Sequence, residues 1–359
     1  MTDNTARPDS SFDLQAKDPL MHALEQRQTM AGLIFAAMSM PRTLAAPERS
    51  LPLTIIGGFL GAGKTTLLNR LLSDPGGRRL VVLVNDFGKI NIDAALIADQ
   101  TDDTINLTNG CACCAVSSDL SKSLVEITQR DDRPDAVILE TSGVADPGAI
   151  GQIALANGSI RLDGILTVVD AETLPDRAAD PVTRHLFNDQ MSSADMILLS
   201  KTDLVDHTGR AAAQDWLERQ FPKKTVLKSV EGSVPTEVVL GIGAEHDIVN
   251  ATIDHGSQGT IGHGFESVSI EIGEPLDEAA VRAFLSDLPD NIMRAKGFVS
   301  LAQAPDRRTI FQRVGRRWSL AQDNMWPKEE RRTSLVFIGP HGALDRDRLL
   351  AELKDCVED

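Results

Sequence analysis

The chain has 359 residues, of which 36 are Lys or Arg and 52 are Asp or Glu, so its formal net charge is −16. Hydrophobic residues make up 42% and charged residues 25%, values typical of a globular protein, which excludes a wholly disordered or fibrous chain. At about 150 residues per domain, the length indicates two domains. The acidic balance argues against nucleic-acid binding, which needs a basic surface. The sequence contains no uninterrupted apolar stretch of about 18 residues, so we expect no membrane span.

Residues 51–231 alternate short apolar runs with helical stretches. The apolar runs are Leu51–Ile56, Leu80–Val84, Ala136–Leu139, Gly164–Val169 and Met196–Leu199, and the helical stretches are Lys64–Ser73, Ser118–Gln129, Pro147–Ala156, Val182–Ser192 and Gly209–Gln220. Strands that are buried on both faces and alternate with helices predict an α/β domain with a mostly parallel sheet.

The segments on either side of this domain have different patterns. Residues 1–50 open with polar residues and have no clear hydrophobic period, which predicts a flexible N-terminal extension. Residues 232–264 are rich in Gly and predict a linker. Residues 265–359 contain closely spaced strand candidates, from Glu266–Ile272 to Ser334–Ile338, and a last helix over Leu344–Leu353. They predict a smaller α+β C-terminal domain with an antiparallel sheet.

The strongest local signal is Gly58–Thr65, which reads GFLGAGKT and fits the pattern G-x-x-x-x-G-K-[ST] of a P-loop NTPase. It lies between a predicted strand and a predicted helix, where backbone N–H groups and the helix N-terminus can bind phosphates. We expect Lys64 to reach the β- and γ-phosphates and the Thr65 hydroxyl to bind Mg²⁺. The predicted nucleotide-binding residues of this segment are Gly58, Gly61, Ala62, Gly63, Lys64, Thr65 and Thr66.

An acidic residue, Glu140, ends the apolar run Ala136–Leu139 and precedes a glycine turn. An acid at this place in a P-loop fold holds Mg²⁺ through water or orients the attacking water. The alternative is a buried strand-end carboxylate in a salt bridge. We predict Lys64, Thr65 and Glu140 as the catalytic residues.

The segment Ser200–Asp203 reads SKTD and follows the apolar run Met196–Leu199. GTPases that read guanine usually carry Asn-Lys-x-Asp here, because the Asp carboxylate accepts two N–H groups of guanine that adenine does not offer. Ser200 replaces the usual Asn, whereas Lys201 and Asp203 remain. We therefore predict that Lys201 and Asp203 bind the base and that GTP is favoured over ATP.

Three of the four cysteines, Cys111, Cys113 and Cys114, lie within four residues. Neighbours this close cannot build a disulfide framework, so they indicate metal or redox chemistry in a reducing, cytoplasmic compartment. Thiolates suit Zn²⁺, and Asp86 is a possible oxygen ligand nearby. A redox pair or inert buried thiols are the alternatives.

Together these motifs resemble the CobW-type family of metal-handling GTPases, whose wider relatives include UreG and HypB. The matching segments are GGFLGAGKTTLLN (57–69), NDFG (85–88), GCACC (110–114), ETSGVADP (140–147), SKTDL (200–204) and, in the second domain, RAKG (294–297), Trp318 and VFIG (336–339). Two features depart from the family pattern. Lys89 replaces a second acid, and the linker carries only the scattered His246, His255 and His263.

The resemblance implies a GTPase that uses GTP and Mg(II), binds Zn(II) or Co(II) at the Cys motif and delivers it to a client metalloprotein. No arginine finger is evident in the motifs, so we expect slow intrinsic hydrolysis. Two other functions stay open: a P-loop kinase or ATPase that acts on a small molecule and has structural cysteines, and a GTPase that loads an organometallic cofactor. Arg294, Lys296, Trp318 and Trp326 either contact the client or have buried structural roles.

Overall fold

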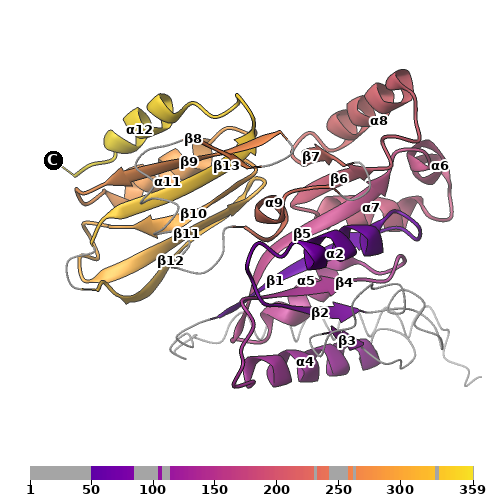
Figure 1. Ribbon diagram of the computed structural model, residues 1–359, viewed down its shortest axis with the longest axis horizontal. Helices are drawn as coiled ribbons and strands as arrows, with labels where there is room; N and C mark the ends of the chain where they lie inside the picture. The colour runs from indigo at the N-terminus through magenta and orange to yellow at the C-terminus, as the bar shows by residue number, and fades with distance from the viewer. Residues whose placement is uncertain are drawn as a thin grey trace, which may run out of the picture. The chain divides into compact units, whose positions relative to one another are not determined.

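Figure 1 shows the computed structural model of the chain. The structure describes residues 50–84, 104–106, 114–229, 233–241, 258–261, 264–327 and 331–358. The predicted N-terminal extension therefore lies outside the described residues, apart from residue 50. No helix in the described ranges combines the length and the apolar character needed to cross a membrane.

The first sheet is parallel throughout and has seven strands in the order β3-β2-β4-β1-β5-β6-β7. The strands are β1 (Leu51–Gly58), β2 (Leu80–Val84), β3 (Thr104–Asn106), β4 (Ala136–Glu140), β5 (Ile160–Asp170), β6 (Met196–Ser200) and β7 (Thr225–Lys228). This confirms the predicted α/β domain with a parallel sheet. All five predicted strands are present, and the structure adds the short β3 and β7 at the two edges.

Helices cover both faces of this sheet, so successive strand residues enter different cores (Figure 1). In β6, Leu198 packs in the core with α2 and α9, whereas Ile197 and Leu199 pack in the core with α6, α7 and α8. The helices α4 and α5 enclose a third core with β1, β2 and β4. The helices are α2 (Lys64–Ser73), α4 (Cys114–Thr128), α5 (Pro147–Leu155), α6 (Leu174–Ala179), α7 (Arg184–Ser193), α8 (His207–Gln220) and α9 (Thr236–Leu240). Burial on both faces is what made these strands recognisable as continuous apolar runs.

The second sheet is antiparallel, with six strands in the order β12-β11-β10-β13-β9-β8. Its strands are β8 (Gln258–Ile261), β9 (Phe265–Ile272), β10 (Arg294–Val299), β11 (Arg307–Val314), β12 (Arg317–Met325) and β13 (Thr333–Pro340). The helices α11 (Glu278–Asp287) and α12 (Arg346–Lys354) pack on it around the buried Phe311 and Phe337. The predicted smaller α+β domain is confirmed. The elements α9 and β8 lie inside the segment predicted as a linker.

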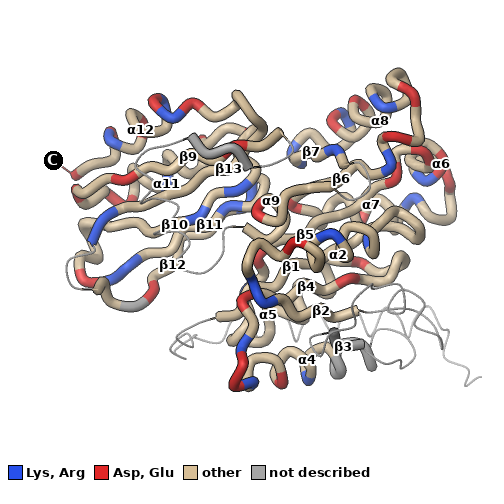
Figure 2. Tube along the Cα trace, in the orientation of Figure 1, with Lys and Arg blue, Asp and Glu red and all other residues tan. Residues whose placement is uncertain are grey.

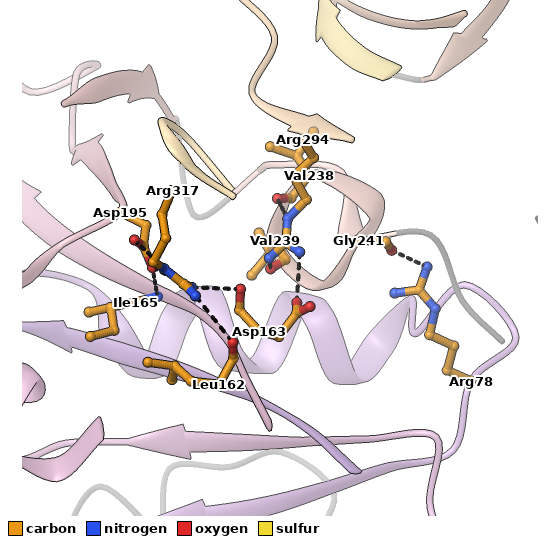
Figure 3. Close-up of polar contacts among 10 residues, drawn as sticks. All are labelled: Arg78, Leu162, Asp163, Ile165, Asp195, Val238, Val239, Gly241, Arg294 and Arg317. Atoms are coloured by element: carbon orange, nitrogen blue, oxygen red, sulfur yellow. Dashed lines mark hydrogen bonds and ion pairs between the residues drawn. The ribbon is translucent and has the colours of Figure 1, made fainter. Parts of the chain in front are cut away.

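A buried ion pair joins the second domain to the first sheet. Arg294, at the start of β10, places Nη1 2.6 Å from Oδ2 of Asp163 on β5, and both side chains are at most 10% exposed. The same guanidinium donates to the carbonyl groups of Val238 and Val239 in α9 (Figure 3). Basic positions gather where β10 and β11 approach α9 (Figure 2). Lys296 lies on β10, and burial together with the charge of Arg161 lowers its pKa to about 8.

A second ion pair and a shared core complete this junction. Arg317 binds Asp195 through Nε and Nη2, each 2.8 Å from a carboxylate oxygen, in the two-pronged geometry that suits guanidinium (Figure 3). Asp195 also accepts from the backbone N–H of Ile165 on β5. Next to this pair, a Cβ on Gly315 would lie 2.3 Å from the Asp195 carbonyl oxygen. Three side chains of the second domain belong to the same core as α2: Met293, Val314 and Ile338. Polar and apolar contacts therefore fix the second domain to the amino-terminal parts of β5 and β6.

The Asp163–Arg294 pair gives the fold a testable dependence on pH. Burial opposes charge on Asp163, but the guanidinium groups of Arg294 and Arg161 hold its pKa below the ordinary value. Such a carboxyl stabilises the fold above its unfolded pKa of about 3.9, and this contribution is lost as pH falls through the folded pKa. We expect Asp163→Asn to lower the free energy of unfolding at neutral pH by about 3 kcal/mol, because it leaves the Arg294 charge buried without its partner.

Urea unfolding at neutral and acidic pH measures this effect. The variant should lose less stability on acidification than the wild type, and the exposed Asp131→Asn should behave like the wild type. Equal acid dependence in Asp163→Asn and in the wild type would contradict the assignment.

Candidate nucleotide-binding site

The predicted phosphate loop forms between β1 and α2 with a backbone that requires glycine. Gly58 has φ +131° and Gly63 has φ +101°, values in the region that other residues rarely adopt. A Cβ on Gly58 would also lie 2.2 Å from the carbonyl oxygen of Val168 on the neighbouring strand. The loop can therefore bring its backbone close to β5 and still begin α2 at Lys64, which leaves the helix N-terminus facing the loop.

The three predicted catalytic residues meet beside this loop. Strand β4 pairs with β1 so that Glu140 lies opposite Ile56, close to the point where the loop begins. The Thr65 hydroxyl donates to Oε1 of Glu140 at 2.9 Å, and Glu140 is 2% exposed. Lys64 is buried, and its ammonium group donates to the Phe59 carbonyl oxygen at 3.2 Å across the loop. The structure thus brings Lys64, Thr65 and Glu140 together.

The oxygen atoms around this contact suit a hard divalent cation. Carboxylate and hydroxyl groups are the protein ligands that Mg²⁺ accepts, usually one or two of them together with water and phosphate oxygens. Glu140 and Thr65 supply one of each. Within the described part of the chain, the buried hydroxyl groups of Thr141 and Ser142, directly after Glu140, make no hydrogen bond. The residues present therefore fit a Mg²⁺–nucleotide complex.

Ser200, the last residue of β6 and the one that departs from the guanine motif, binds the phosphate loop. The Ser200 hydroxyl donates to the Ala62 carbonyl oxygen at 2.6 Å, and Ser200 is 4% exposed. Lys201 adopts a left-handed backbone, φ +53°, and its ammonium group lies 2.8 Å from Oδ2 of Asp170 at the end of β5. Asp203 is exposed. Ser200 therefore supplies a direct link to the phosphate loop from the position of the usual Asn.

The segment 141–146, which joins β4 to α5, packs directly on the phosphate loop. A Cβ on Gly143 would lie 2.5 Å from the backbone nitrogen of Leu60, and a Cβ on Gly57 would lie 2.4 Å from Pro147. Asp146 accepts from the backbone N–H of Gly148 and caps α5. We call residues 141–146 the β4–α5 loop. The two loops are therefore in direct contact at Gly143.

Three residues beside the site were not predicted from the sequence. Asp170, the partner of Lys201, directly follows the predicted strand Gly164–Val169, so its position after that strand was the available signal. Arg177 stacks its guanidinium 4.2 Å from the centre of the Phe59 ring, but its helix α6 was not predicted. Gln190 contacts the β4–α5 loop from α7, and a glutamine on an amphipathic helix gives no sequence signal because most are exposed.

Most of the predicted metal ligands lie outside the described residues. Asp86, Cys111 and Cys113 are in segments that the structure does not describe, and Cys114 begins α4. Among the residues that are described, no three His, Cys, Asp or Glu side chains are close enough to share a metal ion. Cys356 is free and buried in the core of the second domain, where burial raises the pKa of its thiol.

Comparison with known proteins places this site in a family. Residues 52–228 match the CobW/HypB/UreG nucleotide-binding domain, and residues 265–357 match the cobalamin synthesis protein CobW C-terminal domain. The chain is 34% identical over 340 residues to the zinc chaperone CobW of Sinorhizobium sp, an alignment that covers 83% of this chain and 95% of that protein. The chain belongs to the CobW family.

Two further relatives extend this comparison. The zinc chaperone YjiA of Escherichia coli is 30% identical over 304 residues, covering 80% of this chain and 94% of that protein. The zinc-regulated GTPase metalloprotein activator 1 of Dictyostelium discoideum is 27% identical over 383 residues, an alignment that covers 86% of this chain and 80% of that protein. Membership of the CobW family confirms the resemblance predicted from the motifs. The P-loop site at the carboxyl ends of β1, β4 and β6 lies within the nucleotide-binding domain of this family.

Proposed function

We propose that the protein is a GTP-hydrolysing metallochaperone that binds Zn(II), with Co(II) as the alternative cargo, and delivers it to a client metalloprotein. The observation that carries the enzymatic half is the contact between the Thr65 hydroxyl and Glu140 beside a glycine-built phosphate loop. The names of the CobW, YjiA and activator relatives support the zinc half.

Each residue of the site has a role in this proposal. The backbone of Gly58, Gly61, Ala62 and Gly63, with Lys64 and Thr66, holds the phosphates. Thr65 and Glu140 hold Mg(II), which, when bound, neutralises charge on the β- and γ-phosphates. The alternative role for Glu140 is to orient the attacking water. Intrinsic turnover is slow in this proposal, because the phosphate-binding motifs contain no arginine.

Base recognition is assigned to the segment after β6. The exposed Asp203 accepts the two N–H groups of guanine, and the Lys201 stem covers the base. The 2.8 Å contact with Asp170 supports this role for Lys201, because it fixes the ammonium group and so leaves the stem in one position. The left-handed backbone at Lys201 turns the chain between these two side chains.

The metal site is assigned to Cys111, Cys113 and Cys114, with Asp86 as a further ligand. The described elements offer a physical route between this segment and the nucleotide. Helix α4 begins at Cys114, and its Leu120, Leu124 and Ile127 pack in the same core as β4, which ends at Glu140. Helix α4 therefore packs against the strand that carries Glu140. Adjacent thiols must stay reduced to bind metal, which favours the cytoplasm as the site of action.

The rival functions make different predictions. A P-loop kinase or ATPase with structural cysteines would use ATP, form a phosphorylated small molecule and respond to no metal. A GTPase that loads an organometallic cofactor would share the nucleotide chemistry but capture a different client and cargo. Nucleotide competition together with metal analysis of the purified protein separates the first rival, and analysis of the delivered cargo separates the second.

The guanine assignment is tested by Asp203→Asn. The amide of Asn donates where the carboxylate accepted, so it opposes the 2-amino group of guanine and suits the carbonyl oxygen that xanthine carries there. We expect the affinity for GTP to fall by about 100-fold and that for XTP to rise, as judged by equilibrium binding of fluorescent nucleotides. Asp215→Asn on the exposed face of α8 is the matched control. Unchanged GTP affinity in Asp203→Asn would contradict guanine recognition by this residue.

The metallochaperone assignment is tested by zinc affinity in two nucleotide states. We expect tighter zinc binding with a non-hydrolysable GTP analogue than with GDP, by about 5–150-fold, the usual range of coupling between two sites. Cys113→Ala should lose both the binding and the difference, whereas Cys356→Ala, which removes the thiol from the second domain, should keep both. Equal zinc affinities in the two nucleotide states would remove the coupling.

A further inference from the structure

Gln190 is a buried polar side chain in the middle of α7 whose amide faces the β4–α5 loop. Its relative exposure is 0%. The Nε2 group donates to the carbonyl oxygen of Gly143 at 3.2 Å and to that of Ala145 at 2.9 Å. A single side chain thus binds two carbonyl groups of the loop that follows Glu140. A buried amide at this position is costly unless it is paired, so its contacts with the loop decide its role.

The helix that carries Gln190 is a rigid platform. Its neighbours Phe187 and Met191 are buried in the core against β5 and β6. The Gln190 backbone carbonyl accepts from the hydroxyl of Thr167 on β5 at 3.1 Å, and Thr167 is itself fully buried. The amide group is therefore fixed relative to the sheet, and the β4–α5 loop is positioned against it.

The loop that Gln190 holds contacts the reaction site on its other side. The carbonyl oxygen of Gly143 accepts from Gln190. Gly143 also packs so closely against Leu60 of the phosphate loop that a Cβ would not fit there. Glu140, three residues earlier, receives the hydrogen bond from Thr65. The loop thus lies between a fixed amide and the phosphate loop, where the γ-phosphate of the proposed substrate would bind.

The Gln190 amide also carries an acceptor, its side-chain oxygen Oε1. Its Oε1 is buried and accepts no hydrogen bond from the described residues. A buried acceptor without a donor costs free energy, and a loop N–H that turned toward α7 would satisfy it. Glutamine is suited to this place because it carries a donor and an acceptor on one planar group.

We propose that Gln190 is a positioning residue that holds the β4–α5 loop in two arrangements, one for each nucleotide state. In the present arrangement Nε2 binds the carbonyl groups of Gly143 and Ala145. In the arrangement adopted with the γ-phosphate, a peptide of the loop turns and its N–H donates to Oε1. Gln190 touches neither nucleotide nor metal in this inference, which rests on the proposed GTP hydrolysis and acts through the loop.

The variants Gln190→Met and Gln190→Glu test this role. Methionine keeps the length and removes both the donor and the acceptor, whereas glutamate keeps the shape and the acceptors and removes the donors. We expect kcat for GTP to fall by about tenfold or more in both, while the affinity for GDP changes by less than about threefold. The ratio of affinities for GDP and for a non-hydrolysable GTP analogue should shift at least about fivefold. Gln220→Met, at an exposed position on α8, is the matched control.

A merely structural role gives a different result. In that case the affinities for GDP and the GTP analogue would fall by the same factor and kcat would follow the loss of folded protein, which would overturn the inference. Wild-type kcat and an unchanged affinity ratio in the folded variants would overturn it as well. If the wild type itself hydrolyses no GTP, the proposed function fails rather than the role of Gln190.

A measurement on the wild type keeps the inference testable whether or not the variants fold. The side-chain amide resonances of Gln190, assigned by isotope labelling, should shift between the GDP complex and the GTP-analogue complex. Identical resonances in the two complexes would show that the amide keeps one set of partners, and this would overturn the proposal.

Discussion

The candidate site depends most on the direct packing of the phosphate loop against the β4–α5 loop. Gly143 meets the backbone of Leu60, and Thr65 binds Glu140, so the two loops make contact at a backbone position and at a side-chain pair. Packed protein interiors transmit strain, so we expect a ligand that moves one loop to affect the other. This contact connects the phosphate loop to the segment that follows Glu140.

The strands β5 and β6 connect this site to the second domain. At their carboxyl ends they carry Asp170 and Ser200, which hold Lys201 and the phosphate loop. Toward their amino ends lie Asp163 and Asp195, which bind arginines of the second domain. The second domain is thus attached to strands that also carry α7 and Gln190. The second domain and the nucleotide-binding site therefore lie at opposite ends of the same two strands.

The sequence predicted the elements whose signals are local. The strands of the parallel sheet are continuous apolar runs, and the phosphate loop is a glycine pattern between a strand and a helix. Contacts between distant residues were not predictable, because no local pattern marks them: Asp163 and Arg294 are 131 residues apart, and Gln190 lies 47 residues from Gly143. Arg294 had two open interpretations, client contact or structural role, and its burial beside Asp163 supports the structural one. The short α6, β3 and β7 fell below the length at which periodicity is informative.

Hydrogen–deuterium exchange of the backbone amides in the β4–α5 loop, residues 141–146, tests the proposed response to nucleotide. The protein would be compared in complex with GDP and with a non-hydrolysable GTP analogue. We expect exchange in this loop to differ between the two complexes, whereas the amides of β10, which carries the junction residue Arg294, should exchange alike in both. The same exchange in residues 141–146 in both complexes would contradict a β4–α5 loop that responds to the γ-phosphate.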